Sequence, residues 1–188
     1  MKKNGFTLIE LMIVISIIGI LAVALGFSYR DWMGKYKVEK TTKEFYSDLL
    51  EARSRAMQMN HGYVADFPAA TQYRIAEDMD DGGTINVGDN ILPTFPKILE
   101  YTISVFSRND MTNALTNVPI ANVDISFNRR GFVTARNRVT AQELFTPWTT
   151  TRGIISFTST SVPDYDCISL TRTRMNMGWF TGGSCIEK

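Results

Sequence analysis

Glu10 is an acidic residue at the start of a long apolar stretch. Between Leu11 and Phe27 the only polar side chain is that of Ser16, and Leu, Ile, Met and Ala dominate. A carboxylate inside the apolar part of a membrane is costly, and it marks a functional site or a partner. No residue nearby in this chain neutralises Glu10. We therefore expect a positive group of another molecule to pair with it.

A free α-amino group at Phe6 would supply such a charge. If the chain is cut after Gly5, the new amine carries a positive charge near neutral pH and can pair with Glu10 of a neighbouring copy or a partner. The segment departs from an ordinary secretory signal, because its basic part is short and no small-residue cleavage pattern follows the apolar run. A signal anchor that happens to contain a glutamate is the alternative interpretation.

Glu10 belongs to residues 6–28, whose apolar composition predicts a membrane-spanning helix. About 20 apolar residues in a helix span the hydrocarbon core of a bilayer. Lys2 and Lys3 precede the run and favour a cytoplasmic N-terminus, which places the C-terminal part on the other side. Tyr29 and Trp32, with Arg30 between them, form an interfacial aromatic and basic group.

The N-terminal motif resembles the class III leader of type IV pilins and type II secretion pseudopilins. It reads Lys-Lys-Asn-Gly at residues 2–5, then Phe-Thr-Leu-Ile-Glu-Leu at residues 6–11. The resemblance implies that a prepilin peptidase cleaves between Gly5 and Phe6, that Phe6 is N-methylated, and that Glu10 governs subunit assembly. Besides the prepilin peptidase, the implied partners are other pilin or pseudopilin subunits, an inner-membrane assembly platform and the membrane. The resemblance also implies a bacterial inner-membrane location with a periplasmic head, followed by entry into a filament.

Residues 29–62 predict an amphipathic continuation of the helix, because apolar side chains recur every three or four residues. These side chains are Val38, Phe45, Leu49, Ala52, Ala56 and Met59. Asn60, His61 and Gly62 predict the end, with Gly62 as the left-handed cap. Many type IV pilins carry a helix-bending proline at the position of Phe27, so the resemblance does not imply a proline kink here.

After Gly62, short alternating runs predict a β-rich head over residues 63–188. The expected strands are residues 63–67, 72–76, 99–106, 123–127, 132–134, 153–158 and 167–171. Residues 77–96 predict a long surface loop. One antiparallel sheet wrapped on the second half of the helix would bury both the apolar stripe and the strands, which gives an α+β fold.

Two further segments resemble the GspH/FimT type of minor pseudopilins and minor pilins. One is the post-membrane helix at residues 42–64, and the other is an apolar-Phe-x-x-x-Gly hairpin at residues 125–131. The resemblance implies a structural subunit of a type IV pilus or a type II secretion pseudopilus.

Cys167 and Cys185 are the two cysteines of the chain, and an even pair outside the cytoplasm predicts a disulfide. Closing this loop contributes about 3 kcal/mol in the chain-entropy model. A metal-binding pair is the alternative, but no third or fourth ligand lies at a suitable spacing. Within the loop, Trp179 and Phe180 either form an exposed interface or pack onto the sheet.

Arg172 and Arg174 form a candidate DNA-binding motif. Thr-Arg-Thr-Arg at residues 171–174 resembles the Gly-Arg-x-Arg motif by which some members of this family bind DNA during natural transformation. Arginines that alternate along one face can contact successive phosphates. The motif's glycine is a threonine here, and arginines paired with Asp164 or Asp166 that hold a loop are the alternative.

The chain shows no sign of an enzyme. Its 188 residues carry a net charge of +1, which gives no strong global field. No nucleophile elbow, phosphate-binding glycine loop or zinc-protease motif is present, and His61, the only histidine, is expected to be an exposed cap residue. The acidic run at residues 77–83 could hold calcium but lacks EF-hand spacing, and a solvated loop is favoured. We expect no metal and no cofactor.

Overall fold

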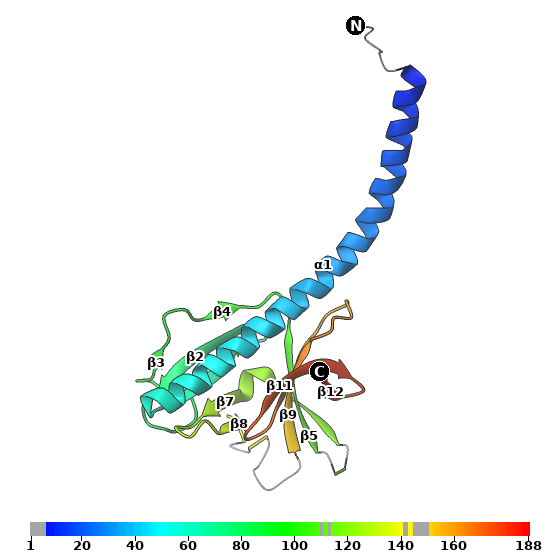
Figure 1. Cartoon of the computed structure of the whole chain (residues 1–188). Helices are drawn as coiled ribbons and strands as arrows, with labels where there is room; N and C mark the ends of the chain where they lie inside the picture. The colour runs from blue at the N-terminus through cyan, green and yellow to red at the C-terminus, as the bar shows by residue number, and fades with distance from the viewer. Residues whose placement is uncertain (1–6, 110, 113, 141–142, 145–150) are drawn as a thin grey trace.

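The computed structural model of the chain describes residues 7–188, except residues 110, 113, 141–142 and 145–150. A long helix, α1 (Leu8–Met59), carries a β-rich head on its second half, and its first half projects away from the head (Figure 1). The strands are β1 (Gly62–Ala69), β2 (Gln72–Asp78), β3 (Asn90–Ile91), β4 (Lys97–Ile98), β5 (Ile103–Asn109), β6 (Leu115–Val118), β7 (Val123–Phe127), β8 (Val133–Asn137), β9 (Thr151–Phe157), β10 (Cys167–Leu170), β11 (Met175–Thr181) and β12 (Ser184–Glu187), with a 3-10 turn, η1 (Ile120–Asn122), before β7.

Helix α1 is unbroken along its whole length, and it curves smoothly (Figure 1). Gly19, Gly26 and Gly34 lie within it and do not interrupt it. Long helices bend gently around a core without a proline, because hydrogen bonds on the solvent side lengthen slightly. The curvature therefore needs no proline at the position of Phe27.

Asn60, and not Gly62, ends the helix, so the predicted cap is wrong by two residues. Asn60 adopts the left-handed conformation with φ 57° and ψ 31°. Asparagine tolerates this conformation because its short polar side chain can bond locally. Gly62 is already the first residue of β1, and its N–H donates to Oδ1 of Asp81 at 3.0 Å. His61 is exposed beside the cap, as expected.

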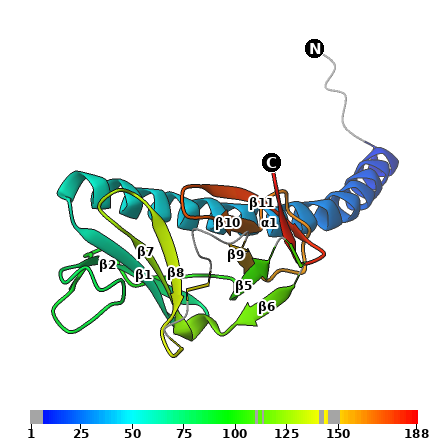
Figure 2. The same ribbon diagram turned by 90° about the horizontal axis from the view of Figure 1, so that it is seen from below.

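The head contains two antiparallel sheets, where the sequence predicts one. The first has the order β3-β2-β1-β7-β8, with β4 also paired to β2, and the second has the order β12-β11-β10-β9-β5-β6. The chain leaves the first sheet after β4, enters the second at β5 and β6, and returns for β7 and β8. Figure 2 shows the first sheet under the C-terminal end of α1 and the second nearer the middle of the helix. The α+β fold class is confirmed.

Phe45 joins the helix to both sheets. Its ring centroid lies 5.9 Å from that of Phe67 and 4.7 Å from that of Tyr73, both in the first sheet, and 5.9 Å from that of Phe157 in the second. The predicted apolar stripe is buried from Val38 to Ala56, whereas Met59 is exposed. These contacts place the core between the second half of α1 and the two sheets.

Two tyrosines also fix the helix on the head. The hydroxyl of Tyr46 donates to the carbonyl oxygen of Met175 at 2.9 Å in the second sheet. The hydroxyl of Tyr73 in the first sheet donates to Asp48 of the helix, which also pairs with Lys97 at 2.6 Å. Burial, followed by this hydrogen bond, raises the pKa of Tyr73 above its ordinary value.

The predicted Cys167–Cys185 disulfide is present and joins β10 to β12, with Cα atoms 5.9 Å apart. Strand β11 runs between those two strands, and Gly178 of β11 lies opposite Cys167. A Cβ at Gly178 would lie 2.1 Å from the carbonyl oxygen of Ile186. The missing side chain therefore lets β12 approach β11 closely enough for the disulfide to close.

Trp179 and Phe180, for which the sequence left an exposed interface and packing onto the sheet both open, lie in strand β11 and are half-buried. The ring of Phe180 stacks on Phe106 with centroids 5.3 Å apart. Together with Ile154 they cover the disulfide in a small second cluster on the outer face of the second sheet. Of the two possibilities, packing onto the sheet is therefore correct for Phe180.

Candidate functional site

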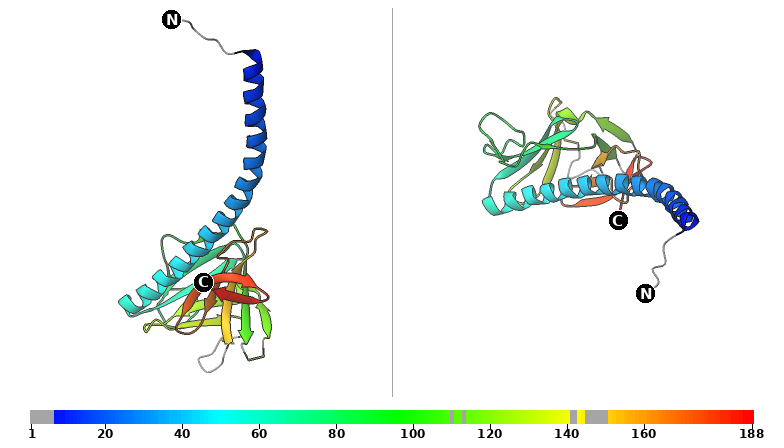
Figure 3. Two further views of the ribbon diagram at one scale, coloured as in Figure 1. Left: turned by 45° about the vertical axis from the view of Figure 1, so that its right-hand side comes forward. Right: turned by 90° about the horizontal axis from the view of Figure 1, so that it is seen from above.

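The first half of α1 exposes apolar side chains around its whole circumference. From Leu8 to Val23 each large apolar side chain is at least 45% exposed. Figures 1 and 3 show this half extending well beyond the head. A helix that is apolar on all sides is stable only when other apolar matter surrounds it. The apolar surroundings that bury these side chains must therefore belong to other molecules.

Glu10 lies in the first turn of this exposed half. The N–H of Glu10 donates to Oγ1 of Thr7, the N-cap residue, at 3.3 Å. The Glu10 side chain is exposed, and among residues 7–188 as described it makes no hydrogen bond or ion pair. The carboxylate thus faces outward without a partner. Gly5 and Phe6, the predicted cleavage and methylation residues, lie outside the described residues.

Thr7 is a site residue that the motif reasoning missed. Its side chain satisfies one of the free N–H groups at the start of α1. The signal was present, because Thr7 and Glu10 have the Thr-x-x-Glu spacing of a capping box just before an apolar run. An acidic residue in the first turn also interacts favourably with the helix dipole. Thr7 therefore fixes the turn that presents Glu10.

An aromatic group marks the junction between the two halves of the helix. The ring of Trp32 lies 6.2 Å from Tyr29 and stacks on Tyr36 at 5.8 Å, and all three side chains are exposed. The sequence predicts that residues 6–28, just before this group, cross a membrane. No helical stretch in the described part of the chain combines enough length with enough hydropathy to do so.

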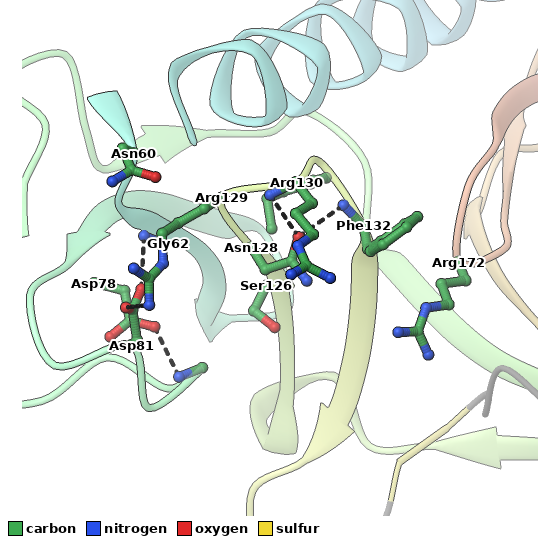
Figure 4. Close-up of a pocket in the computed structure, with 12 residues that line it drawn as sticks. Asn60, Gly62, Asp78, Asp81, Ser126, Asn128, Arg129, Arg130, Phe132 and Arg172 are labelled. Carbon is green, nitrogen blue, oxygen red and sulfur yellow. Dashed lines mark hydrogen bonds and ion pairs between the residues drawn. The ribbon is translucent and has the colours of Figure 1, made fainter. Parts of the chain in front are cut away.

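A basic pocket of about 630 Å³ lies at the C-terminal end of α1, between the β7–β8 turn and the acidic loop (Figure 4). Arg129, Arg130 and Arg172 line it together with Asp78 and Asp81. The three guanidinium groups outnumber the two carboxylates, so the net charge of these side chains is positive. We use the term basic pocket for this set of residues.

The β7–β8 turn positions Arg129 and Arg130 at the pocket. Oδ1 of Asn128 accepts the N–H groups of Arg130 at 2.9 Å and Phe132 at 3.0 Å, which closes the turn. Gly131 has a φ of 74°, and a side chain there would meet the sulfur of Met57 on the helix at 2.7 Å. Arg129 pairs with Asp81 across the pocket at 2.9 Å (Figure 4).

Arg172 and Arg174 lie in the turn between β10 and β11, and they do not alternate along one face. Arg172 lines the basic pocket, and its guanidinium lies over the ring of Phe132 at 5.0 Å. Arg174 lines a separate hollow beside Arg152. The turn is fixed because Arg53 of α1 donates to the carbonyl oxygen of Thr173 at 3.0 Å.

The two aspartates that could have held these arginines have other partners. Asp164 pairs with Lys188, which lowers the pKa of its carboxyl group. Oδ1 of Asp166 accepts the N–H of Phe180 at 2.6 Å, and burial raises the pKa of Asp166. The arginine-anchored loop expected as an alternative is therefore not formed with these aspartates.

The acidic loop brings the carboxylates of Asp78, Asp80 and Asp89 within 4.8 Å of one another. Each of the three accepts backbone N–H groups of the loop, such as Gly83 to Asp78 at 2.7 Å and Asn86 to Asp89 at 2.6 Å. Burial raises the pKa of Asp78, and a hydrogen bond with Asp78 lowers that of exposed Asp80. The acidic run thus organises its own loop.

Comparison with known proteins gives one family match and several relatives that each match part of the chain. Residues 1–26 match the prokaryotic N-terminal methylation motif. Over 73 residues the chain is 37% identical to a fimbrial protein of Pseudomonas aeruginosa, which covers 39% of this chain and 47% of that protein. Over 46 residues it is 52% identical to fimbrial protein EcpB of Eikenella corrodens, which covers 24% of this chain and 29% of that protein. No solved structure matches.

The methylation motif at residues 1–26 and the similarity to fimbrial proteins agree with the resemblance of the leader to that of type IV pilins and pseudopilins. The chain spans about half the length, or less, of the curated relatives that it matches.

Proposed function

We propose that this chain is a minor pilin or pseudopilin, a structural subunit of a type IV pilus or a type II secretion pseudopilus that assembles through α1. The observation that carries the proposal is the apolar first half of the helix, exposed on all sides. In its first turn lies the carboxylate of Glu10, which has no partner among the described residues. The methylation motif at residues 1–26 and the fimbrial relatives support the same role. We assign no enzymatic activity.

The proposed maturation divides the chain into four parts. A prepilin peptidase removes residues 1–5 by cleaving between Gly5 and Phe6, and Phe6 is then N-methylated. Residues 6–28 are held in the bacterial inner membrane and later enter the filament core. Residues 29–62 support the head, and residues 63–188 form the head in the periplasm.

Assembly follows from the charges at the new N-terminus. On the inner-membrane platform, lipid around residues 6–28 is replaced by the apolar helices of neighbouring subunits. The amine of Phe6 of one subunit pairs with the Glu10 carboxylate of the adjacent one. This pairing removes the cost of keeping an unpaired charge in apolar surroundings, so Glu10 sets the register in which subunits add.

The head is consistent with the GspH/FimT type. The β7–β8 hairpin carries Phe127 and Gly131 in the apolar-Phe-x-x-x-Gly pattern, and the left-handed Gly131 packs under the end of α1. Because the matched relatives cover only 39% and 24% of the chain, this finer placement rests on the hairpin and on the resemblance at residues 42–64.

Glu10→Ala tests the proposal in cells that express the remaining subunits. We expect the variant to reach the membrane but to disappear from the sheared filament fraction, because the Phe6 amine loses its partner. Glu51→Ala, which removes an exposed carboxylate paired with Arg55 at 2.7 Å, is the matched control and is expected to assemble normally. Filament incorporation of Glu10→Ala equal to that of Glu51→Ala would contradict the proposal.

A second candidate function, DNA binding for uptake, is favoured by the basic pocket, which gathers Arg129, Arg130 and Arg172. Phosphates of DNA would contact these arginines, and binding would weaken as the salt concentration rises. In a mobility shift of the full chain in detergent, we expect Arg130→Gln and Arg172→Gln to weaken binding more than Arg174→Gln. Arg55→Gln is the control. Absence of any shift at low salt contradicts DNA binding.

A further inference from the structure

A small hollow on the outer face of the second sheet brings together side chains from four adjacent strands. Its volume is about 260 Å³. The side chains that the argument uses are Arg152 of β9, Ser169 of β10, Asn176 of β11, Glu187 of β12 and Arg174 from the turn before β11. We call this set the outer hollow.

The outer hollow lies on the face of the sheet that points away from the helix. Ile168 and Leu170 belong to the main core beneath α1. Because side chains alternate along a strand, Ser169 between them points to the opposite face. In register, Ser169 lies opposite Ile154 of β9 and Asn176 of β11.

The hydroxyl of Ser169 is buried without a partner. Ser169 is 2% exposed, and its Oγ is the one buried side-chain oxygen or nitrogen in the described part of the chain that lacks a hydrogen bond. Nearly all buried polar groups in folded proteins have a partner, so an orphan at the edge of a hollow calls for an explanation. A ligand oxygen that enters the outer hollow would supply the missing bond.

Two neighbours of Ser169, Arg174 and Asn176, also offer free donors. The side chains of Arg174 and Asn176 make no hydrogen bond or ion pair among the described residues. Arg152 pairs with Glu187 at 3.8 Å, so the carboxylate of the hollow does not balance the charge of Arg174. Two guanidinium groups against one carboxylate leave a net positive charge.

We propose that the outer hollow binds a small oxyanion. The guanidinium of Arg174, the amide of Asn176 and the hydroxyl of Ser169 donate to its oxygens, and Arg152 supplies the second positive charge. Guanidinium and amide donors at converging angles are the groups that recognise phosphate and carboxylate. The volume suits one such group and is small for a drug-sized ligand. The site is separate from the basic pocket and does not depend on the proposed role in a filament.

Phosphate and carboxylate share this chemistry, so the experiment has two arms. The full chain in a non-ionic detergent is titrated calorimetrically with inorganic phosphate and, separately, with acetate, with chloride at equal ionic strength as the blank. We expect saturable binding at one site. Tighter phosphate binding identifies a phosphate site, tighter acetate binding identifies a site for a carboxylate, and heats equal to the chloride blank in both arms overturn the proposal.

Variants separate this site from the basic pocket. We expect Arg174→Gln to weaken binding about tenfold, because a charged donor is lost, and Ser169→Ala to weaken it several-fold. Arg55→Gln, at an exposed arginine that pairs with Glu51 outside both pockets, is the matched control and is expected to leave binding unchanged. Weakening by Arg130→Gln without weakening by Arg174→Gln would overturn the assignment.

The melting temperature of Ser169→Ala gives an independent readout. Without anion, the variant is expected to be at least as stable as the native chain, because it removes an unpaired buried hydroxyl. With phosphate or acetate, the native chain is expected to gain more stability than the variant. A Ser169→Ala chain that is equally destabilised with and without anion would show that the hydroxyl has a purely structural role, which contradicts the proposal.

Discussion

Asp66 and Asp124 lie directly opposite one another on the neighbouring strands β1 and β7, and both are fully buried. Like charges in this position destabilise a sheet. The guanidinium of Arg138 compensates both negative charges. Its Nη2 donates to Asp66 at 3.2 Å, and its Nε donates to Asp124 at 3.0 Å. Arg74 also forms a bidentate ion pair with Asp66, with hydrogen bonds of 2.7 and 2.8 Å. The pair of carboxylates is therefore tolerable only with its arginines.

We predict that Arg138→Met lowers the free energy of unfolding by about 3 kcal/mol, because it leaves Asp124 buried without a cation. Arg55→Met, which breaks an exposed pair one helical turn apart with Glu51, is expected to cost less than about 0.5 kcal/mol. Adding Asp124→Asn to Arg138→Met is expected to restore part of the loss. Denaturant unfolding of the full chain in detergent measures all three, and equal costs for the two single variants would contradict the prediction.

We predict that Gly178→Ala destabilises the head by about 3 kcal/mol, the upper end of overpacking costs. The new methyl group would collide with backbone atoms of Ile186, which cannot rotate away as a side chain could. We also expect incomplete closure of the disulfide, visible as free thiol by alkylation and mass spectrometry. Gly19→Ala meets no atom within 4 Å and is expected to be neutral or slightly stabilising. Full disulfide formation with unchanged stability in Gly178→Ala would refute the close-approach argument.

Asp166 gives a prediction for pH dependence. Burial raises its pKa, so the folded chain holds this proton more tightly than the unfolded chain. The contribution of Asp166 to stability therefore falls as the pH rises from about 4, the ordinary aspartate pKa, through the raised value.

Asp166→Asn removes this titration and keeps the oxygen that accepts the N–H of Phe180. We expect the variant to become progressively more stable than the native chain as the pH rises through that interval, and the difference then to stay constant. Paired denaturant curves at several pH values measure it. A difference that is the same at pH 4 and pH 7 would rule out the raised pKa.

We predict that Thr7→Ala loosens the first turn of α1 by about 1 kcal/mol, because the N–H of Glu10 loses its acceptor. Faster amide hydrogen exchange at Glu10 reports this change, and Thr7→Ser is expected to retain protection. Assembly is expected to suffer less than in Glu10→Ala, since the carboxylate is still present. Unchanged protection in Thr7→Ala would exclude the capping role.

Local patterns predicted the helix and the short hairpins well. The spacing of Phe45, Leu49, Ala52 and Ala56 indicates a buried face from sequence neighbours alone, and the structure buries all four. The β1–β2 and β7–β8 hairpins were predicted for the same reason, since each joins runs that are adjacent in the chain. The disulfide was predicted because only two cysteines are available.

The β11–β12 hairpin was missed although its signal was local. Gly182 and Gly183 form a two-residue turn with φ values of 56° and 77°, which is the glycine-rich turn that suits a tight hairpin. The predicted strands end at residue 171, and Trp179 and Phe180 were assigned only to the disulfide loop, as either an exposed interface or residues packed onto the sheet. The division into two sheets had no such signal, because it depends on pairings such as β1 with β7 and β5 with β9, which join distant segments.

The candidate sites also differ in whether their residues are close together in the sequence. The proposed role of Glu10 rests on one residue in one segment of the sequence. The basic pocket and the outer hollow are formed by turns and strands that meet only in the folded head, so their members could not be grouped from the sequence. Arg172 and Arg174 are separated only by Thr173, yet they line different hollows.

The account depends most on the maturation of the N-terminus. Intact-mass spectrometry of the chain purified from the membranes of its own cells measures this directly. We predict a mass that lacks residues 1–5 and gains one methyl group, with fragmentation that places the methyl group on the amine of Phe6. A chain that retains Met1 and carries no methyl group would contradict the account.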